Sequence, residues 1–421
     1  MTNKKIKIGI IGLGYVGLPL AALLSDKYLC KGFDISNERI KELNAGFDRT
    51  EEISREQIRN LSNLNFTNKI SDLSKCNFFI ITVPTPIDKS MMPDFGPLES
   101  ASKLVGSILK KDDIVVYEST VYPGATEEIC VPILEKISKL NAYSDFLFGY
   151  SPERINPGDK ENKVENIVKV TSGCNEFAAK AIDDVYSSVI NAGTFKASSV
   201  KVAEAAKVIE NAQRDVNIAF MNQISLIFSK LDISTRDVLD AAGSKWNFLK
   251  FSPGLVGGHC IGVDPYYLIK KSEAAGCNPA LLKVSRDINE SMAINIIEKI
   301  EKHSHKNNEK SALILGATFK EDCPDLRNSK VLDLYNLLIE KEYSVSIIDN
   351  IANQDEMLDL YGDDFGDNKE TYDLVILAVP HADFFKNNIM SYQSRLNSNG
   401  ILFDIKSRLE SSPDGITILR L

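Results

Sequence analysis

The stretch that decides the fold is IKIGIIGLGYVG at residues 6–17, an apolar run that leads straight into a glycine-rich turn. The glycines of this Gly-X-Gly-X-X-Gly motif are Gly12, Gly14 and Gly17. In such a motif the first glycine makes the tight turn, the second lets backbone amides meet a pyrophosphate, and the third lets the following helix pack against the strand. Residues 18–27 carry the helical pattern that the motif requires. The stretch therefore predicts a dinucleotide-binding α/β domain, with Tyr15 and Val16 in its phosphate-binding turn.

Asp34 ends a second short strand, twenty residues past Gly14. A carboxylate at this place accepts hydrogen bonds from the adenosine ribose of NAD and repels the additional 2′-phosphate of NADP. We therefore expect NAD as the cofactor. Arg39 lies close enough in the sequence to meet a 2′-phosphate, so NADP stays open as the weaker alternative.

Polar residues follow three further apolar runs, which resemble buried parallel strands at residues 78–83, 114–117 and 146–150. Thr85, Thr120, and the pair Glu153 and Arg154 come just after the ends of these runs. In an open α/β sheet, ligands bind outside the carboxyl ends of the strands, so we expect these side chains in one crevice with the cofactor. Taken singly, each could equally be a loop residue or a helix cap.

A single long helix is predicted over residues 198–230, followed by a second long helical pattern at residues 279–302. A helix near thirty residues is more often a spine between domains or subunits than a crossover helix. Lys207 and Asn211 stand one turn apart on the first helix and share a face. Without further context they would form an ordinary solvated polar stripe.

Cys260 lies in GLVGGHCIGVDP at residues 254–265, the most informative stretch for the chemistry. A thiol flanked by glycines lies on backbone that a ligand can approach closely, and Asp264 supplies a charge nearby. The alternative is a small buried hydrophobic residue in a glycine-rich turn. The context of the other motifs favours a nucleophile.

The C-terminal part repeats the punctuation of the first domain in weaker form. Residues 303–310 have no apolar periodicity and are typical of a linker. Strand-like runs then return at residues 312–316, 345–349 and 374–380. They predict a second nucleotide-binding α/β domain, although without the glycine motif. After its first strand, Lys320 and Arg327 offer cations to phosphate groups that glycine amides do not reach.

The composition fits a soluble cytoplasmic enzyme with more than one domain. The chain has 421 residues, more than one hydrophobic core usually serves. Its net charge of −9 argues against binding to nucleic acid, and no apolar stretch approaches the ~20 residues of a membrane helix. The seven cysteines are scattered and never spaced as CxxC, and the histidines have no metal-ligand spacing. We expect no metal, no nucleic acid and no membrane insertion.

Six motifs in a fixed order carry a family resemblance over nearly the whole chain. They are the glycine motif with Asp34, Ser119-Thr120-Val121, Ser151-Pro152-Glu153-Arg154, Lys207 to Asn211, Gly257-Gly258-His259-Cys260, and Phe319-Lys320 to Arg327. This order resembles the UDP-glucose/GDP-mannose 6-dehydrogenase family. The residues around the thiol, His259 before it and Val263-Asp264-Pro265-Tyr266-Tyr267 after it, resemble the branch that acts on UDP-N-acetylhexosamines. Bacterial members of this branch supply capsule, Vi-type or O-antigen polysaccharides.

The resemblance implies a four-electron oxidation of the sugar C6 hydroxyl to a carboxylate by NAD, with Cys260 as the nucleophile. A thiolate would capture the intermediate aldehyde as a thiohemiacetal, and loss of the second hydride would leave a thioester that water hydrolyses. Lys207 and Asn211 would stabilise the oxyanions. The residues that would position and activate water are Thr120, Asp264 and Glu153, the last as our preferred hydrolytic base.

Two binding sets complete the expected site. Cofactor contacts are expected from Gly12, Gly14, Tyr15, Val16, Gly17, Asp34, Arg39, Thr85, Thr120 and Arg327. Substrate contacts are expected from Glu153, Arg154, Lys207, Asn211, Lys250, Gly257, His259, Lys320 and Arg408, with Lys320 and Arg327 also proposed to hold the UDP phosphates.

The patterns together predict an α/β protein of two Rossmann-like, doubly wound parallel-sheet domains joined by a helical region with a long central helix. We place the NAD-binding domain at residues 1–196, the central helical domain at 197–305 and the UDP-binding domain at 306–421. The long helix favours a homodimer.

Other functions stay open. UDP-N-acetylglucosamine is the favoured substrate, followed by the galactosamine epimer, with UDP-N-acetylmannosamine or UDP-glucose as alternatives, because discrimination rests on a few polar contacts. A dehydrogenase that performs a single oxidation would share the first domain but would not need Cys260. A non-enzymatic NAD sensor would keep the glycine motif and lose the cluster of Lys207, Asn211 and Cys260.

Overall fold

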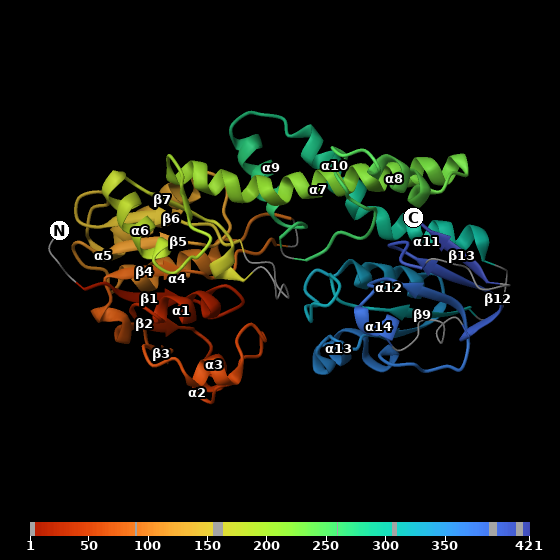
Figure 1. The fold of residues 1–421 in the computed structure, drawn as a ribbon, viewed down its shortest axis with the longest axis horizontal. Coiled ribbons are helices and arrows are strands. Elements are labelled where there is room, and N and C mark those ends of the chain that lie inside the picture. The colour runs from red at the N-terminus through yellow and green to blue at the C-terminus, as the bar shows by residue number, and fades with distance from the viewer. Residues whose placement is uncertain are drawn as a thin grey trace. The chain divides into compact units, whose positions relative to one another are not determined.

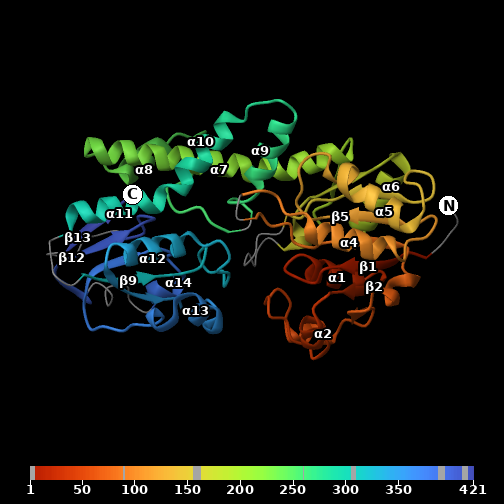
Figure 2. The same ribbon diagram turned by 180° about the vertical axis from the view of Figure 1, so that it is seen from behind.

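The computed structural model describes residues 5–88, 91–154, 163–258, 260–304, 310–386, 394–409 and 416–421. The chain divides into two compact units, Met1–Glu210 with Tyr266–Gly276, and Asn211–Pro265 with Cys277–Leu421. Each unit contains one sheet, and the elements of both can be followed in Figure 1 and from behind in Figure 2.

The first unit is built on an eight-stranded sheet in the order β3-β2-β1-β4-β5-β6-β7-β8. Its strands are β1 (Lys7–Ile11), β2 (Leu29–Phe33), β3 (Leu64–Thr67), β4 (Phe78–Ile81), β5 (Ile114–Tyr117), β6 (Leu147–Tyr150), β7 (Lys169–Gly173) and β8 (Thr194–Lys196). The neighbours pair in parallel except β6 and β7, which pair antiparallel. The strand order reverses between β1 and β4, the switch point at which such sheets bind their ligands.

Helices cover both faces of this sheet. They are α1 (Gly17–Ser25), α2 (Asn37–Asn44), α3 (Arg55–Arg59), α4 (Gly96–Gly106), α5 (Val131–Ser138) and α6 (Glu176–Ser187), with the short turns η1 (Ile70–Lys75), η2 (Thr126–Cys130) and η3 (Val164–Asn166). Ile8 and Ile10 pack in the core with α1 and α6, whereas Ile11 packs in the core with α4 and α5. Successive residues of a strand point to opposite faces, so a strand buried on both sides must be apolar throughout. This explains the unbroken apolar run before Gly12.

The second unit is built on a five-stranded parallel sheet in the order β10-β9-β11-β12-β13. Its strands are β9 (Lys310–Leu315), β10 (Tyr343–Ile348), β11 (Tyr372–Leu377), β12 (Leu396–Asp404) and β13 (Thr417–Arg420). Counted from β9 this is the order 2-1-3-4-5, the flavodoxin-like form of the doubly wound fold, whereas β1 to β6 follow the dinucleotide-binding order 3-2-1-4-5-6. Both sheets therefore agree with the predicted fold class.

The remaining helices include the long α7 (Val200–Leu231), whose residues up to Glu210 belong to the first unit. The others are α8 (Thr235–Gly243), α9 (Asp264–Ala274), α10 (Ala280–Glu290), α11 (Met292–His303), α12 (Lys330–Glu340), α13 (Gln354–Tyr361), η4 (Gly362–Asp364) and α14 (Ala382–Lys386). The long helix agrees with its prediction, but the single helix predicted over residues 279–302 is two helices that meet at Ser291. The Ser291 hydroxyl donates to the carbonyl of Ile288 at 2.8 Å, the local competition by which serine disfavours a continuous helix.

Candidate functional site

The dinucleotide turn follows β1 and has the geometry that its glycines predict. Gly12 has a φ of +97°, which favours glycine. A Cβ on Gly17 would lie 1.9 Å from the carbonyl oxygen of Gly12, so no larger residue fits where α1 begins. Gly14 is exposed, and no atom lies within 4 Å of the position of its missing Cβ. The turn therefore leaves its backbone open to a pyrophosphate, in the segment that also holds the half-buried Tyr15 and Val16.

Asp34 follows β2 and lies beside this turn. Its Oδ2 accepts a hydrogen bond from the amide of Leu13 at 2.9 Å, and its Oδ1 accepts from the amide of Ser36 at 2.9 Å. The residue is half-buried, so its carboxylate keeps lone pairs for further donors. This is the position that recognition of the NAD ribose requires.

Arg39 lies behind the turn and is buried, in contrast to an arginine open to a 2′-phosphate. Its Nε donates to the carbonyl oxygen of Leu13 at 2.9 Å, and its Nη2 donates to Oδ1 of Asp48 at 2.7 Å. Asp48 carries no motif and was not singled out from the sequence. No sequence pattern connects it to Arg39, nine residues before it.

Thr85 and Thr120 lie after the neighbouring strands β4 and β5 and contact each other. The hydroxyl of Thr85 donates to the carbonyl oxygen of Thr120 at 2.7 Å. The Tyr267 hydroxyl, from α9, donates to the carbonyl oxygen of Thr85 at 2.9 Å. The ends of β4 and β5 thus bring these two threonines together.

Glu153 and Lys207 form a buried ion pair in the first unit. Lys207 Nζ lies 3.6 Å from Oε2 of Glu153, and the two residues are 5% and 9% exposed. Burial raises the pKa of Glu153 from its usual range, although Lys207 and Lys169 act in the opposite direction. A carboxylate with a raised pKa is a stronger base than an ordinary carboxylate, which suits it to take a proton from water. Arg154, next in the chain, pairs instead with Glu210 and donates to the carbonyl of Val168 at 2.9 Å.

A second buried ion pair supports the first, and the sequence analysis missed it. Lys169 Nζ lies 2.7 Å from Oε2 of Glu118 and 3.0 Å from the carbonyl oxygen of Pro152, the residue before Glu153. Tyr186 donates its hydroxyl to Glu118. A cavity of about 10 Å³ touches Glu118, Glu153 and Lys169, about the space of one water molecule. The sequence signal is a lysine between two valines, Val168 and Val170.

The thiol of Cys260 lies in the second unit, in a half-buried turn at the start of α9. The amide of Asp264 donates to the carbonyl oxygen of Cys260 at 2.8 Å. The Asp264 side chain is 1% exposed and accepts from Nδ2 of Asn211 at 2.5 Å. Asn211 is thereby held beside the carboxylate that the thiol turn presents. His259 lies outside the described residues.

The glycines before the thiol are needed because another segment lies against them. A Cβ on Gly257 would lie 2.5 Å from the carbonyl oxygen of Asn328, and one on Gly258 would lie 2.7 Å from the ring of Phe319. Gly254 exchanges two hydrogen bonds with the Asn222 side chain, at 2.8 and 3.1 Å. The thiol turn is therefore positioned by α7 and by the segment that follows β9.

The predicted phosphate contacts of the second unit do not share one environment. Lys320, half-buried, follows the ring of Phe319. Arg327 is exposed and makes a bidentate pair with Asp325, at 2.9 and 2.7 Å. Arg408 is exposed and its guanidinium lies 5.8 Å from the ring centre of Phe385.

Lys250 lines a cavity of about 520 Å³ in the second unit, within the size range of small-molecule sites. Arg236 and Lys406 add two further cations to its wall, and Phe248 and Phe251 add aromatic rings. Cations and rings together suit a nucleotide diphosphate, since phosphates need positive charge and a base needs an apolar surface. Lys250 was predicted as a substrate contact, whereas the other residues that line this cavity carried no prediction.

Two further expectations concern absent features. Within the described ranges, no group of three or more His, Cys, Asp or Glu side chains is arranged to hold a metal ion. In the same part of the chain, no helix combines the length and the apolar character needed to cross a membrane.

Comparisons with known proteins match nearly the whole length of the chain. The chain matches three models of the UDP-glucose/GDP-mannose dehydrogenase family, the NAD binding domain at residues 6–190, the central domain at 201–291 and the UDP binding domain at 313–411. It is 51% identical to Protein CapL of Staphylococcus aureus, with 96% of both chains covered. It is 47% identical to the UDP-N-acetyl-D-glucosamine 6-dehydrogenase of Pseudomonas aeruginosa, over 99% of this chain and 100% of that one. Among solved structures it resembles the UDP-D-ManNAc dehydrogenase of Pyrococcus horikoshii, with a TM-score of 0.87, 29% identity and 99% of both chains covered.

Proposed function

Since the chain belongs to the UDP-glucose/GDP-mannose dehydrogenase family and is an NAD-dependent UDP-sugar 6-dehydrogenase, we propose that its substrate is UDP-N-acetylglucosamine, oxidised at C6 to the uronic acid. The observation that carries this choice is the 47% identity, over the full chain, to a relative named for that substrate. The residues His259 and Val263 to Tyr267 around the thiol support the same branch.

We place the reaction on Cys260, through two oxidations without release of the aldehyde. Bound NAD accepts one hydride in each oxidation, so one UDP-sugar, two NAD⁺ and one water give the uronate, two NADH and three protons. The thiolate adds to the C6 aldehyde and forms a thiohemiacetal, whose oxidation leaves a thioester. Addition of water to the thioester then releases the acid and restores the thiol.

The buried pair of Glu153 and Lys207 supplies the proton transfer and the charge that these steps require. We assign Glu153 as the base that takes a proton from the hydrolytic water, because burial raises its pKa. Lys207, whose Nζ lies 3.6 Å from Oε2 of Glu153, supplies positive charge for the oxyanion. Asn211, held by Asp264, adds an amide donor, and Thr120 positions water.

We assign the UDP moiety to the second unit, with the 520 Å³ cavity as its seat. Lys250, Lys406 and Arg236 offer positive charge to the diphosphate, and Phe248 and Phe251 offer surface to the base. We also propose Lys320 and Arg327 as contacts to the phosphates, and Arg327 would bind them beside its ion pair with Asp325.

We also propose a homodimer, with the exposed apolar side chains of α7 and α10 against a second copy. Phe220, Ile227 and Leu231 on α7 and Leu281 and Val284 on α10 are each more than 40% exposed. Large apolar side chains gathered on helices in this way are typical of an interface between subunits. Light scattering should give a mass of two chains, and Phe220→Glu should shift the measured mass toward that of a single chain.

We place the enzyme in the cytoplasm and assign its product to the synthesis of a bacterial surface polysaccharide. Scattered cysteines without CxxC spacing support a reducing compartment. The resemblance to enzymes that supply such polysaccharides supports the second assignment.

The test is to offer the purified protein NAD⁺ with each of four UDP-sugars and to follow NADH by its absorbance. The four are UDP-N-acetylglucosamine, its galacto and manno epimers, and UDP-glucose. We expect the highest kcat/KM with UDP-N-acetylglucosamine and two NADH per sugar. A preference for another sugar would replace the substrate assignment, and one NADH per sugar would exclude the two-step oxidation.

A further inference from the structure

The backbone of Leu13, between the first two glycines of the dinucleotide turn, is held at both its N–H and its C=O. Its N–H donates to Oδ2 of Asp34 at 2.9 Å, and its C=O accepts from Nε of Arg39 at 2.9 Å. The Leu13 side chain is fully buried. Because both backbone polar groups of Leu13 are engaged, one carboxylate and one guanidinium fix the direction in which the turn presents its following amides.

Arg39 is in turn held at its other end by Asp48. Nη2 of Arg39 lies 2.7 Å from Oδ1 of Asp48, while the carboxylate of Glu42 lies 3.8 Å from Nη1. Arg39 and Asp48 are only 5% and 4% exposed. A buried guanidinium whose carboxylate is removed leaves an uncompensated charge, so Asp48 is required for Arg39 to stay where it is.

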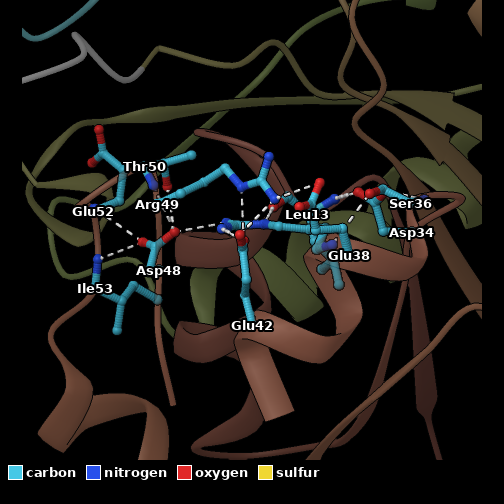
Figure 3. Close-up of polar contacts among 11 residues, drawn as sticks. Leu13, Asp34, Ser36, Glu38, Glu42, Asp48, Arg49, Thr50, Glu52 and Ile53 are labelled. Atoms are coloured by element: carbon cyan, nitrogen blue, oxygen red, sulfur yellow. Dashed lines mark hydrogen bonds and ion pairs between the residues drawn. The ribbon is translucent and has the colours of Figure 1, made fainter. Parts of the chain in front are cut away.

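Asp48 is itself placed by the segment that follows it. Its Oδ1 also accepts from the amide and hydroxyl of Thr50, at 3.0 and 2.7 Å, and its Oδ2 accepts from the amides of Glu52 and Ile53, at 3.0 and 3.1 Å. Figure 3 shows this carboxylate with Thr50 and the 52–53 backbone around it. Only a carboxylate can accept on both oxygens, because an asparagine would turn an NH₂ group toward amide donors.

We propose that Asp48 is a positioning residue for the cofactor, which holds Arg39 against the dinucleotide turn and keeps its guanidinium from serving a 2′-phosphate. The backbone of Arg39 lies close to the ribose site, because its amide donates to the side chain of Ser36. Ser36 caps α2 and stands two residues past Asp34. An arginine near this carboxylate is how NADP enzymes accommodate the phosphate. The selection of NAD then has two parts, repulsion by Asp34 and retention of Arg39 by Asp48.

The competing explanation is that Asp48 only organises its own segment and the start of α3. Such a role would lower thermal stability and leave cofactor binding alone. The two explanations separate in three readouts, which are the dissociation constant of NADH, the division between KM and kcat for NAD⁺, and the kcat/KM ratio of NADP⁺ to NAD⁺.

The experiment compares Asp48→Asn, Arg39→Gln and the double variant with Glu42→Gln as the matched control, at saturating UDP-sugar. Asp48→Asn should weaken NADH binding, measured by fluorescence titration, by about tenfold, the value of one lost charge-assisted contact. KM for NAD⁺ should rise similarly with kcat little changed, and the NADP⁺ to NAD⁺ ratio should rise by about tenfold. Arg39→Gln in the Asp48→Asn background should abolish the gain with NADP⁺ while NADH binding stays weak.

The control carboxylate, Glu42, pairs on the surface with Arg49 and reaches Arg39 only at 3.8 Å, so its variant should leave all three readouts unchanged. Asp48→Asn that melts at a lower temperature with unaltered NADH affinity and an unaltered cofactor ratio would overturn the proposal. If Asp48→Asn does not fold, Arg39→Gln alone decides. It should weaken NADH binding without any gain with NADP⁺, and unchanged NADH affinity would refute the clamp.

Discussion

The two sheets place an aspartate at the same point, the end of their second strand, in different surroundings. Asp34 after β2 accepts from the amide of Leu13, and Asp349 after β10 accepts from the amide of Ala317 at 2.7 Å, the same contact in both turns. Asp34 is half-buried, whereas Asp349 is 4% exposed.

His381 accounts for the difference. It is fully buried, and its Nε2 lies 3.0 Å from Oδ2 of Asp349, which also accepts from the amide of Thr318. Oδ1 of Asp349 accepts from the amides of Ile351 and Ala352, both at 2.8 Å. A carboxylate so engaged has no capacity for ribose hydroxyls. The comparison teaches that the strand–turn–helix frame survives a change of ligand, and that dinucleotide recognition depends on keeping one aspartate open.

The largest expected effect concerns the thiol, which only the second unit carries. Cys260→Ala and Cys260→Ser should lower turnover to the acid by about 10³-fold or more, because a protonated hydroxyl or a methyl group cannot form the thioester. NADH should still bind with its normal affinity, since the cofactor turn is in the first unit. Absorbance assays and fluorescence titration measure the two quantities. Near-normal conversion by Cys260→Ala would make Cys260 a packing residue.

Arg327→Ala tests whether the second unit replaces glycine amides by cations. The loss of one charge-assisted phosphate contact should raise KM for the UDP-sugar by about tenfold and leave KM for NAD⁺ unchanged. Asp325→Asn is the matched control, because it removes the partner and keeps the cation. If UDP binds the Arg327→Ala protein as tightly as the parent by calorimetry, Arg327 serves only its ion pair with Asp325.

The aspartates themselves give the sharpest test of the comparison. Asp34→Ala should reduce the preference for NAD⁺ over NADP⁺ by about tenfold, because the carboxylate no longer repels the 2′-phosphate. Asp349→Ala should leave that preference intact and lower the melting temperature, because several buried donors lose their acceptor. Equal kcat/KM for both cofactors in the unmodified enzyme would mean that Asp34 does not bind the ribose.

The smallest effect on catalysis is expected from two buried carboxyl groups, which instead make the stability of the fold depend on pH. Burial raises the pKa of Glu204 in the first unit to about 7, although amides of Gly124 and Thr126 favour its charged form. Burial also acts on Asp349, but His381 and amide donors lower its pKa to about 2. The contribution of Glu204 to stability is therefore fully present below its unfolded pKa of about 4.5 and is lost as the pH rises through 7. The contribution of Asp349 has the opposite sign, because it is present above about pH 4 and is lost as the pH falls toward 2.

As the pH rises from 5 to 8, the free energy of unfolding of the parent should thus fall relative to that of Glu204→Gln by roughly 1–3 kcal/mol. Melting curves of both proteins at each pH measure this difference. Parallel stability profiles would mean that Glu204 is already ionised at pH 5.

The local order of the chain was readable from the sequence. Apolar runs, the glycine motif, Asp34 and the spacing of Lys207 and Asn211 depend on neighbours only a few residues away, so they predicted the strands, the cofactor turn and the shared helix face. The motif order pointed to the family, which the comparisons confirm.

Tertiary structure alone decided which charges are buried and with what partners. The pairs Asp48 with Arg39, Lys169 with Glu118, and His381 with Asp349 join residues that no local pattern connects. A charged side chain is buried only where a partner compensates its lost hydration, and that partner comes from another strand or loop. The same dependence on distant neighbours set the strand order of the second sheet and buried the guanidinium of Arg39 behind the cofactor turn.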